Sequence, residues 1–135
     1  INAMIIAVDF DGTIVKDRYP GIGDPRPGAI ETLRKLKKEG YILVLWTCRT
    51  GKELAQAVKF CAEAGIRFDA INENLRYRVI EHRGSDPRKL GADLYIDDRG
   101  LIDIPNWDEI YKIVHRRVPD QLERLDMSYG FPPEY

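Results

Sequence analysis

Short apolar runs alternate along the chain with longer segments in which apolar side chains recur every three or four residues. The short runs have the length of β-strands, and the longer segments have the period of amphipathic helices. The predicted strands cover residues 5–8, 41–46, 68–71 and 92–97. The predicted helices cover residues 26–39, residues 50–65 and a segment that begins at residue 106. This alternation is typical of an α/β fold with a mainly parallel sheet.

Capping signals mark where the predicted helices begin and end. Thr50 and Glu53 form a capping-box pattern, and Asn106 with Glu109 three residues further on gives the same signal for the last helix. Pro27 suits the first turn of the first helix. The glycines that end the first two helices are Gly40 and Gly65.

The composition fits one globular domain, since the chain has 135 residues of which 44% are hydrophobic. We assign residues 4–118 to this domain, 119–135 to a C-terminal tail and 1–3 to an expression remnant. With 21 basic and 22 acidic residues, the chain lacks the basic excess of a dedicated nucleic-acid binder. It has no apolar run of roughly 18 residues and no signal-peptide pattern, so we expect a cytoplasmic protein without a membrane span.

Polar residues follow three of the predicted strands. Asp9 follows the first strand and Thr47 the second, while Asp97 and Asp98 end the last. Because the carboxyl ends of parallel strands lie along one edge of a sheet, we expect these side chains to converge there. Carboxylates held together repel one another unless a cation neutralises them, and oxygen ligands suit a hard ion such as Mg²⁺. The plainer alternative is that each acid forms a turn at a strand end.

The motif DFDGT at residues 9–13 resembles the DxDGT signature of the haloacid dehalogenase superfamily, whose members are mostly magnesium-dependent phosphatases. Thr47 after the second strand, Lys89 before the last strand and the acidic pair after it extend the resemblance over residues 4–114. The resemblance implies a Rossmann-like, three-layer α/β sandwich. The segments between the motifs hold little more than the predicted helices and strands, so the protein resembles a capless member of the superfamily.

The resemblance also implies catalytic roles. Asp9 would be the nucleophile that forms an aspartyl phosphate, and Asp11 would be the general acid and base. Thr47 would donate its hydroxyl to a phosphate oxygen, and Lys89 would counter the charge of the phosphate. Lys52, at the start of a predicted helix, is an alternative to Lys89.

A metal site and a phosphate site follow from the same resemblance. The Asp9 carboxylate, the Asp11 backbone carbonyl and Asp97 would hold Mg²⁺, with Asp98 or Asp103 as a further acidic contact. The residues expected to contact the substrate are Gly12, Thr13, Cys48 and Arg49. For the last of these, a surface salt bridge is the alternative.

The substrate class is open at this point. A capless site admits a phosphorylated small molecule or a macromolecular phosphate, and a homo-oligomer could cover it. The stretch ADLYIDDR, 92–99, resembles part of the 5'(3')-deoxyribonucleotidases, which favours a nucleotide-like substrate. Residues 67–89 are rich in arginine and could contact such a substrate through its phosphates. The alternative is that residues 67–89 form an ordinary solvated loop. We therefore expect a magnesium-dependent phosphatase. The alternatives are a phosphotransferase of the same superfamily and a phosphate- or nucleic-acid-binding module without turnover.

Overall fold

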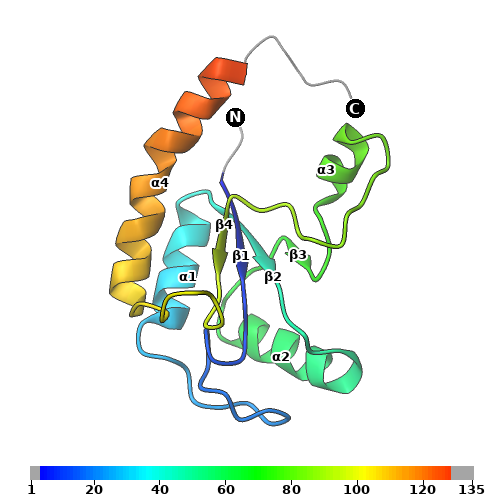
Figure 1. Ribbon diagram of the computed structural model, residues 1–135. Coiled ribbons are helices and arrows are strands. Elements are labelled where there is room, and N and C mark those ends of the chain that lie inside the picture. The colour runs from blue at the N-terminus through cyan, green and yellow to red at the C-terminus, as the bar shows by residue number, and fades with distance from the viewer. Residues whose placement is uncertain (1–3, 129–135) are drawn as a thin grey trace.

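Four strands form one parallel sheet in the computed structural model, which describes residues 4–128 and the side chains up to residue 117. The strands are β1 (Ile5–Val8), β2 (Ile42–Leu45), β3 (Ala70–Ile71) and β4 (Leu94–Ile96). Their order is β3-β2-β1-β4, which puts β1 between β2 and β4 (Figure 1). The side chains of β1 are buried on both faces, as a central parallel strand requires. The predicted parallel α/β fold is thereby confirmed.

Helices and a long connecting segment cover the two faces of the sheet. The helices are α1 (Ala29–Lys38), α2 (Gly51–Glu63), α3 (Arg76–Glu81) and α4 (Trp107–Ser128). Apolar side chains of α1, α2 and α4 pack with Ile6 and Val8 of β1 on one face. On the other face, Ile5 and Ala7 pack with Leu90 from the segment that includes α3. The result is the predicted three-layer sandwich, a single domain without a cap.

This packing fixes β1, from which the candidate site extends. Leu33 and Leu36 of α1 are fully buried, as are Trp107 and Val114 of α4. Burial of each such large apolar side chain contributes about 1.5–3 kcal/mol to the free energy of unfolding. Helices α1 and α4 lie side by side on this face, away from α3 (Figure 1). The carboxyl end of β1 is therefore fixed in place by hydrogen bonds to both neighbouring strands and by packing against the helices on one face of the sheet.

Two of the three predicted helix starts differ in detail from the structure. Thr50 is the N-cap of α2, but its side chain makes no capping hydrogen bond, so the predicted capping box is wrong there. Helix α1 begins after Gly28, which is its N-cap residue and has a φ of 80°. Pro27 therefore lies outside the helix. The Asn106 cap is confirmed, because its Oδ1 accepts a hydrogen bond from the Glu109 amide at 2.9 Å.

Two segments carry structure that the sequence pattern did not predict. Helix α3 lies within the stretch 72–89, for which no element was expected, and α4 continues into the segment 119–135 that was assigned to a tail. Residues 1–3 and 129–135, with the expected remnant and the end of that tail, lie outside the described residues. Within the described part of the chain, no helix is long and apolar enough to span a membrane.

Candidate functional site

Strand register brings three acids together. Val8 of β1 is paired with Leu45 of β2 and with Ile96 of β4, so the residues that follow these strands leave the sheet at one edge. Carboxylate oxygens of Asp9, Asp97 and Asp98 lie within 4.8 Å of one another there. The predicted convergence is confirmed for these three acids. Among the described residues, Asp103 is not part of the group.

Thr13 makes hydrogen bonds to two of these three acidic residues. Its hydroxyl donates a hydrogen bond to Asp9 Oδ2 at 2.8 Å and accepts one from the Asp98 amide at 3.1 Å. Its carbonyl accepts hydrogen bonds from Trp107 Nε1 at 3.0 Å and from Arg26 at 3.4 Å. Thr13 is completely buried. It thus orients the acids from a buried position and does not line the cavity described below, and its predicted contact with a substrate stays a prediction.

Gly12 allows Asp98 to lie against the chain at the DFDGT motif. Its φ is +85°, a conformation that L side chains rarely adopt. A Cβ at this position would also lie 2.2 Å from Asp98 Oδ2, well inside van der Waals contact. Both the backbone conformation and the close approach of Asp98 therefore require glycine here.

The environment of Asp9 opposes its negative charge. Burial is the largest cause that raises the pKa of Asp9, from 3.8 to about 7. A hydrogen bond with Asp98 and the charges of Asp97 and Asp98 raise it further, while the Thr13 hydroxyl lowers it. A cation placed among the three carboxylates would remove this penalty. The donors are carboxylate oxygens, so the group fits a hard metal ion.

Asp11 is not part of the acidic group and is paired with Arg49. Arg49 Nε donates to Asp11 Oδ2 and a terminal nitrogen donates to Oδ1, both at 2.7 Å. The guanidinium side chain is 1% exposed and the Asp11 side chain 16%. This bidentate geometry is the strong form of an arginine–carboxylate pair. Arg49 thus makes a buried ion pair, so the alternative of a surface salt bridge is wrong, while its contact with a substrate phosphate stays a prediction.

An open cavity of about 540 Å³ lies over these residues. Its lining consists of Asp9, Asp11, Asp17, Tyr19, Thr47, Cys48, Arg49, Asp97, Asp98 and Arg99. The Thr47 amide donates to Asn72 Oδ1 at 2.8 Å, which connects the end of β2 to the chain after β3. Seven of these lining residues were predicted as site residues, and three were not. Of the other predicted site residues, Gly12 and Thr13 do not line the cavity.

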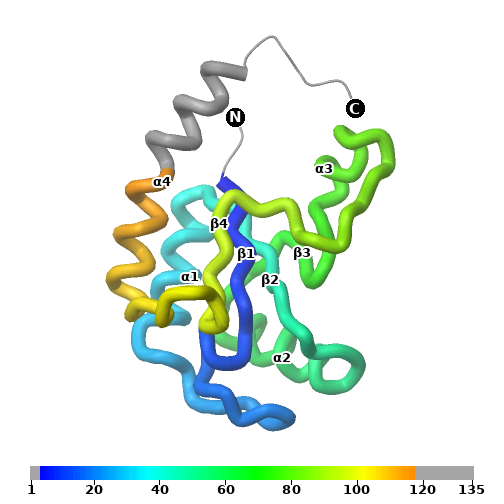
Figure 2. The backbone as a smooth tube through the Cα atoms, viewed as in Figure 1, coloured from blue at the N-terminus to red at the C-terminus, as the bar shows by residue number. Residues whose placement is uncertain are grey.

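Those three unpredicted residues are Asp17, Tyr19 and Arg99. Asp17 and Tyr19 belong to the loop 15–26, which extends beyond the carboxyl end of β1 (Figure 2). No sequence pattern in that loop indicated that Asp17 and Tyr19 belong to the site. Arg99 directly follows the acidic pair, and this adjacency was a signal that could have been used.

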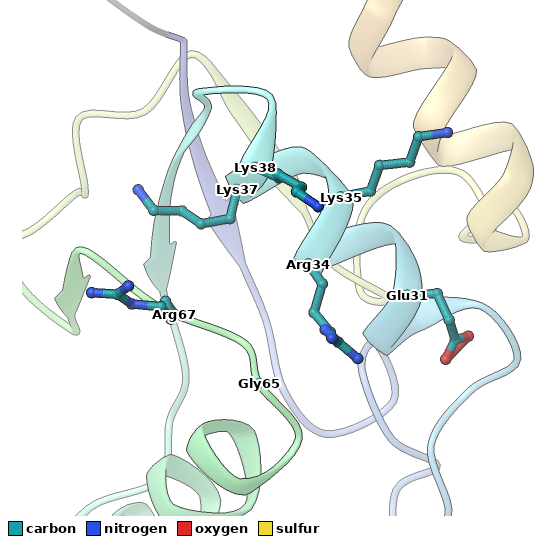
Figure 3. A pocket seen from close by; sticks show the side chains of 7 residues that line it. All are labelled: Glu31, Arg34, Lys35, Lys37, Lys38, Gly65 and Arg67. Atoms are coloured by element: carbon teal, nitrogen blue, oxygen red, sulfur yellow. The ribbon is translucent and has the colours of Figure 1, made fainter.

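Neither candidate lysine lines the cavity. Lys89 Nζ lies 5.7 Å from the centre of the Tyr95 ring, and Lys52 is an exposed residue in the first turn of α2. Basic side chains do gather around a separate hollow of about 660 Å³ on α1, which shares no residue with the cavity (Figure 3). Arg34 and its neighbours on α1 line this hollow together with Arg67, which follows α2.

Comparison with solved structures identifies a relative. A conserved protein from Bacteroides thetaiotaomicron superposes with a TM-score of 0.77 and is 47% identical in sequence. The match covers 86% of this chain and 93% of that protein. The chain belongs to the same family as this conserved protein. No protein-family model matches the chain, and no curated protein matches it. The similarity to this protein therefore supports the parallel α/β fold, and its description gives no activity.

Proposed function

We propose that the protein is a magnesium-dependent phosphatase of the haloacid dehalogenase superfamily. The observation that carries the proposal is the position of the DFDGT motif, whose Asp9 lies within 4.8 Å of the acids that follow β4. Asp9 and Asp11 both line the cavity over this group. A carboxylate nucleophile, a second carboxylate and a hard-metal site are the parts that phosphoryl transfer through an aspartyl phosphate needs.

The metal would be held by Asp9, Asp97 and Asp98. When bound, Mg²⁺ would offset the charge of these carboxylates and of the substrate phosphate. The hydrogen bond from Thr13 restrains the Asp9 side chain through Oδ2, and Asp9 lines the cavity. This arrangement supports Asp9 as the nucleophile.

The reaction would proceed in two steps at Asp9. An Asp9 oxygen forms a bond to phosphorus while the bond from phosphorus to the leaving oxygen breaks, and Asp11 gives that oxygen a proton. Asp11 then accepts a proton from the water that attacks the aspartyl phosphate, which releases inorganic phosphate and restores Asp9. A phosphotransferase would use the same first step with an organic acceptor in place of water.

Phosphate binding is assigned to Thr47 and Arg99. The Thr47 hydroxyl accepts a hydrogen bond from the Arg49 amide at 3.1 Å, and its own proton remains for a phosphate oxygen. Arg99 is an exposed cation in the cavity lining, which supports it over Lys89 and Lys52 as the counter-charge. Arg99→Met should therefore raise KM for a phosphate monoester more than Lys89→Met or Lys52→Met does.

The test is hydrolysis of a panel of phosphate monoesters with and without Mg²⁺. The panel holds nucleotides, sugar phosphates, phosphorylated oligonucleotide ends and a phosphopeptide. Asp9→Asn should abolish turnover, and Asp103→Asn, which removes the same charge outside the acidic group, should retain it. Transfer of the phosphoryl group from the ester to an added alcohol acceptor, without release of inorganic phosphate, would indicate the phosphotransferase. Absence of turnover with every ester in Mg²⁺ would contradict the proposal.

A further inference from the structure

Every donor of the Arg49 guanidinium has an acceptor within the protein. A guanidinium has five N–H donors in a fixed plane. Two go to the Asp11 carboxylate, and the others go to backbone carbonyls at 2.6–3.2 Å. The residues that supply these carbonyls are Pro20, Gly21 and Glu53. Arg49 therefore has no donor left for a substrate phosphate.

Two aromatic rings lie close to the same guanidinium. The Arg49 carbon Cζ lies 5.1 Å from the ring centres of Phe10 and Tyr19. Phe10 is fully buried in the core, whereas Tyr19 stands in the loop 15–26 and lines the cavity. The contacts of Arg49 thus join the DFDGT motif, the loop 15–26 and the first turn of α2 at one point. A planar group restrained by five hydrogen bonds and by its ring contacts has little freedom to move.

The carboxylate of Asp11 gains its orientation from this restrained group. Arg49 holds both Asp11 oxygens at 2.7 Å, and each oxygen keeps a second lone-pair site that can carry the proton Asp11 gives. Catalytic side chains act only when they are held close to the productive geometry by a second set of contacts. Lysine could not substitute, because its ammonium is a point charge with three donors and no planar fork.

We propose that Arg49 is the positioning residue of Asp11 and acts in the reaction through Asp11 alone. This inference rests on the proposed phosphatase activity, in which Asp11 gives a proton to the leaving oxygen. It assigns Arg49 no contact with the substrate. Loss of Arg49 should therefore matter most for substrates whose leaving group needs that proton.

The experiment compares kcat/KM of Arg49→Lys for two monoesters in Mg²⁺. An alkyl phosphate releases a basic alkoxide that needs protonation, whereas p-nitrophenyl phosphate releases a stable phenolate. Because kcat/KM reports steps up to the first irreversible one, it isolates formation of the aspartyl phosphate. We expect a loss of about 100-fold for the alkyl phosphate and only a few-fold for p-nitrophenyl phosphate, within the range of general acid catalysis.

Two further variants sharpen the result. In an Asp11→Asn background, Arg49→Lys should cause no additional loss, because the residue through which it acts is already disabled. Arg34→Lys, the same substitution in the hollow on α1, should leave both rates unchanged (Figure 3). Should Arg49→Lys fail to fold, Tyr19→Leu removes the exposed one of the two rings near the guanidinium and should give a smaller loss with the same substrate dependence.

Equal losses for both esters, or additive losses with Asp11→Asn, would overturn the positioning role while leaving the phosphatase in place. An Arg49→Lys variant that folds and retains full activity on the alkyl phosphate would overturn it as well. Failure of the wild-type protein to hydrolyse any ester would overturn the proposed function, and this inference with it, before any Arg49 variant is compared.

Discussion

Replacement of Asp9 by asparagine should stabilise the metal-free protein. The folded chain holds three carboxylates within 4.8 Å of one another, and burial together with these neighbours raises the pKa of Asp9 to about 7. Asparagine has nearly the same shape and no charge. Its Oδ1 can accept the Thr13 hydrogen bond, and its Nδ2 can donate to Asp98, as the protonated Asp9 does.

The size and sign of the effect follow from the pKa shift. The folded protein binds the Asp9 proton more tightly than the unfolded chain does, so the free energy of unfolding falls as the pH rises from 3.8 to about 7. At about 1.4 kcal/mol per pKa unit, and reduced by half because water in the open cavity screens the charge, the penalty is about 2 kcal/mol at pH 8. Asp9→Asn removes it, which corresponds to a rise in Tm of about 6 °C.

Thermal unfolding in EDTA at pH 4 and pH 8 measures this directly. The variant should match the wild type at pH 4 and exceed it at pH 8. Adding Mg²⁺ should raise the Tm of the wild type more than that of the variant, because the cation stabilises the ionised carboxylate. Asp103→Asn should show no such pH dependence. An Asp9→Asn protein less stable than the wild type at pH 8, or a difference equal at both pH values, would refute the reasoning.

Three other substitutions or reactions test particular contacts. Gly12→Ala should lower the free energy of unfolding by about 2 kcal/mol, from the positive φ and the contact with Asp98, and should weaken Mg²⁺ binding measured by calorimetry. Trp107→Phe should cost about 1–3 kcal/mol in urea unfolding, because it removes a buried hydrogen bond to a loop carbonyl. A thiol reagent at pH 8 should modify the exposed Cys48 and spare Cys61, whose pKa is raised to about 12 by burial, and both should react in denaturant.

Hydrophobic patterning predicted the sheet and the gathering of the acids because both follow from local sequence. The apolar runs of β1 and β2 are buried on both faces, and the position of Asp9 after such a run places it at the carboxyl edge. Helix α3 was missed because none of its six residues is buried, so it carries no apolar stripe. Strand β3 has only two residues, too few for an alternating pattern to set its bounds.

The roles of individual arginine and lysine side chains depend on contacts with residues far away along the chain, which a local sequence pattern does not reveal. Arg49 was expected near a phosphate because it follows Thr47 closely, yet its partners are Asp11 and the loop 15–26, far away along the chain. Lys89 matched a family position by spacing alone, and the long segment before β4 carries it to Tyr95. A buried arginine is recognised only when all of its acceptors are known, and these come from three separate segments.

The short edge strand β4 makes the metal-free site prone to local opening. Two of the three carboxylates follow this three-residue strand, and the Asp9 amide is hydrogen bonded to the Ile96 carbonyl at 2.9 Å. Repulsion between the acids therefore acts against the pairing of β4 with β1 and favours exchange of that amide with solvent. A cation that bridges both strands would slow this exchange. Hydrogen exchange at the Asp9 amide would then report metal occupancy from the backbone, with no substrate needed.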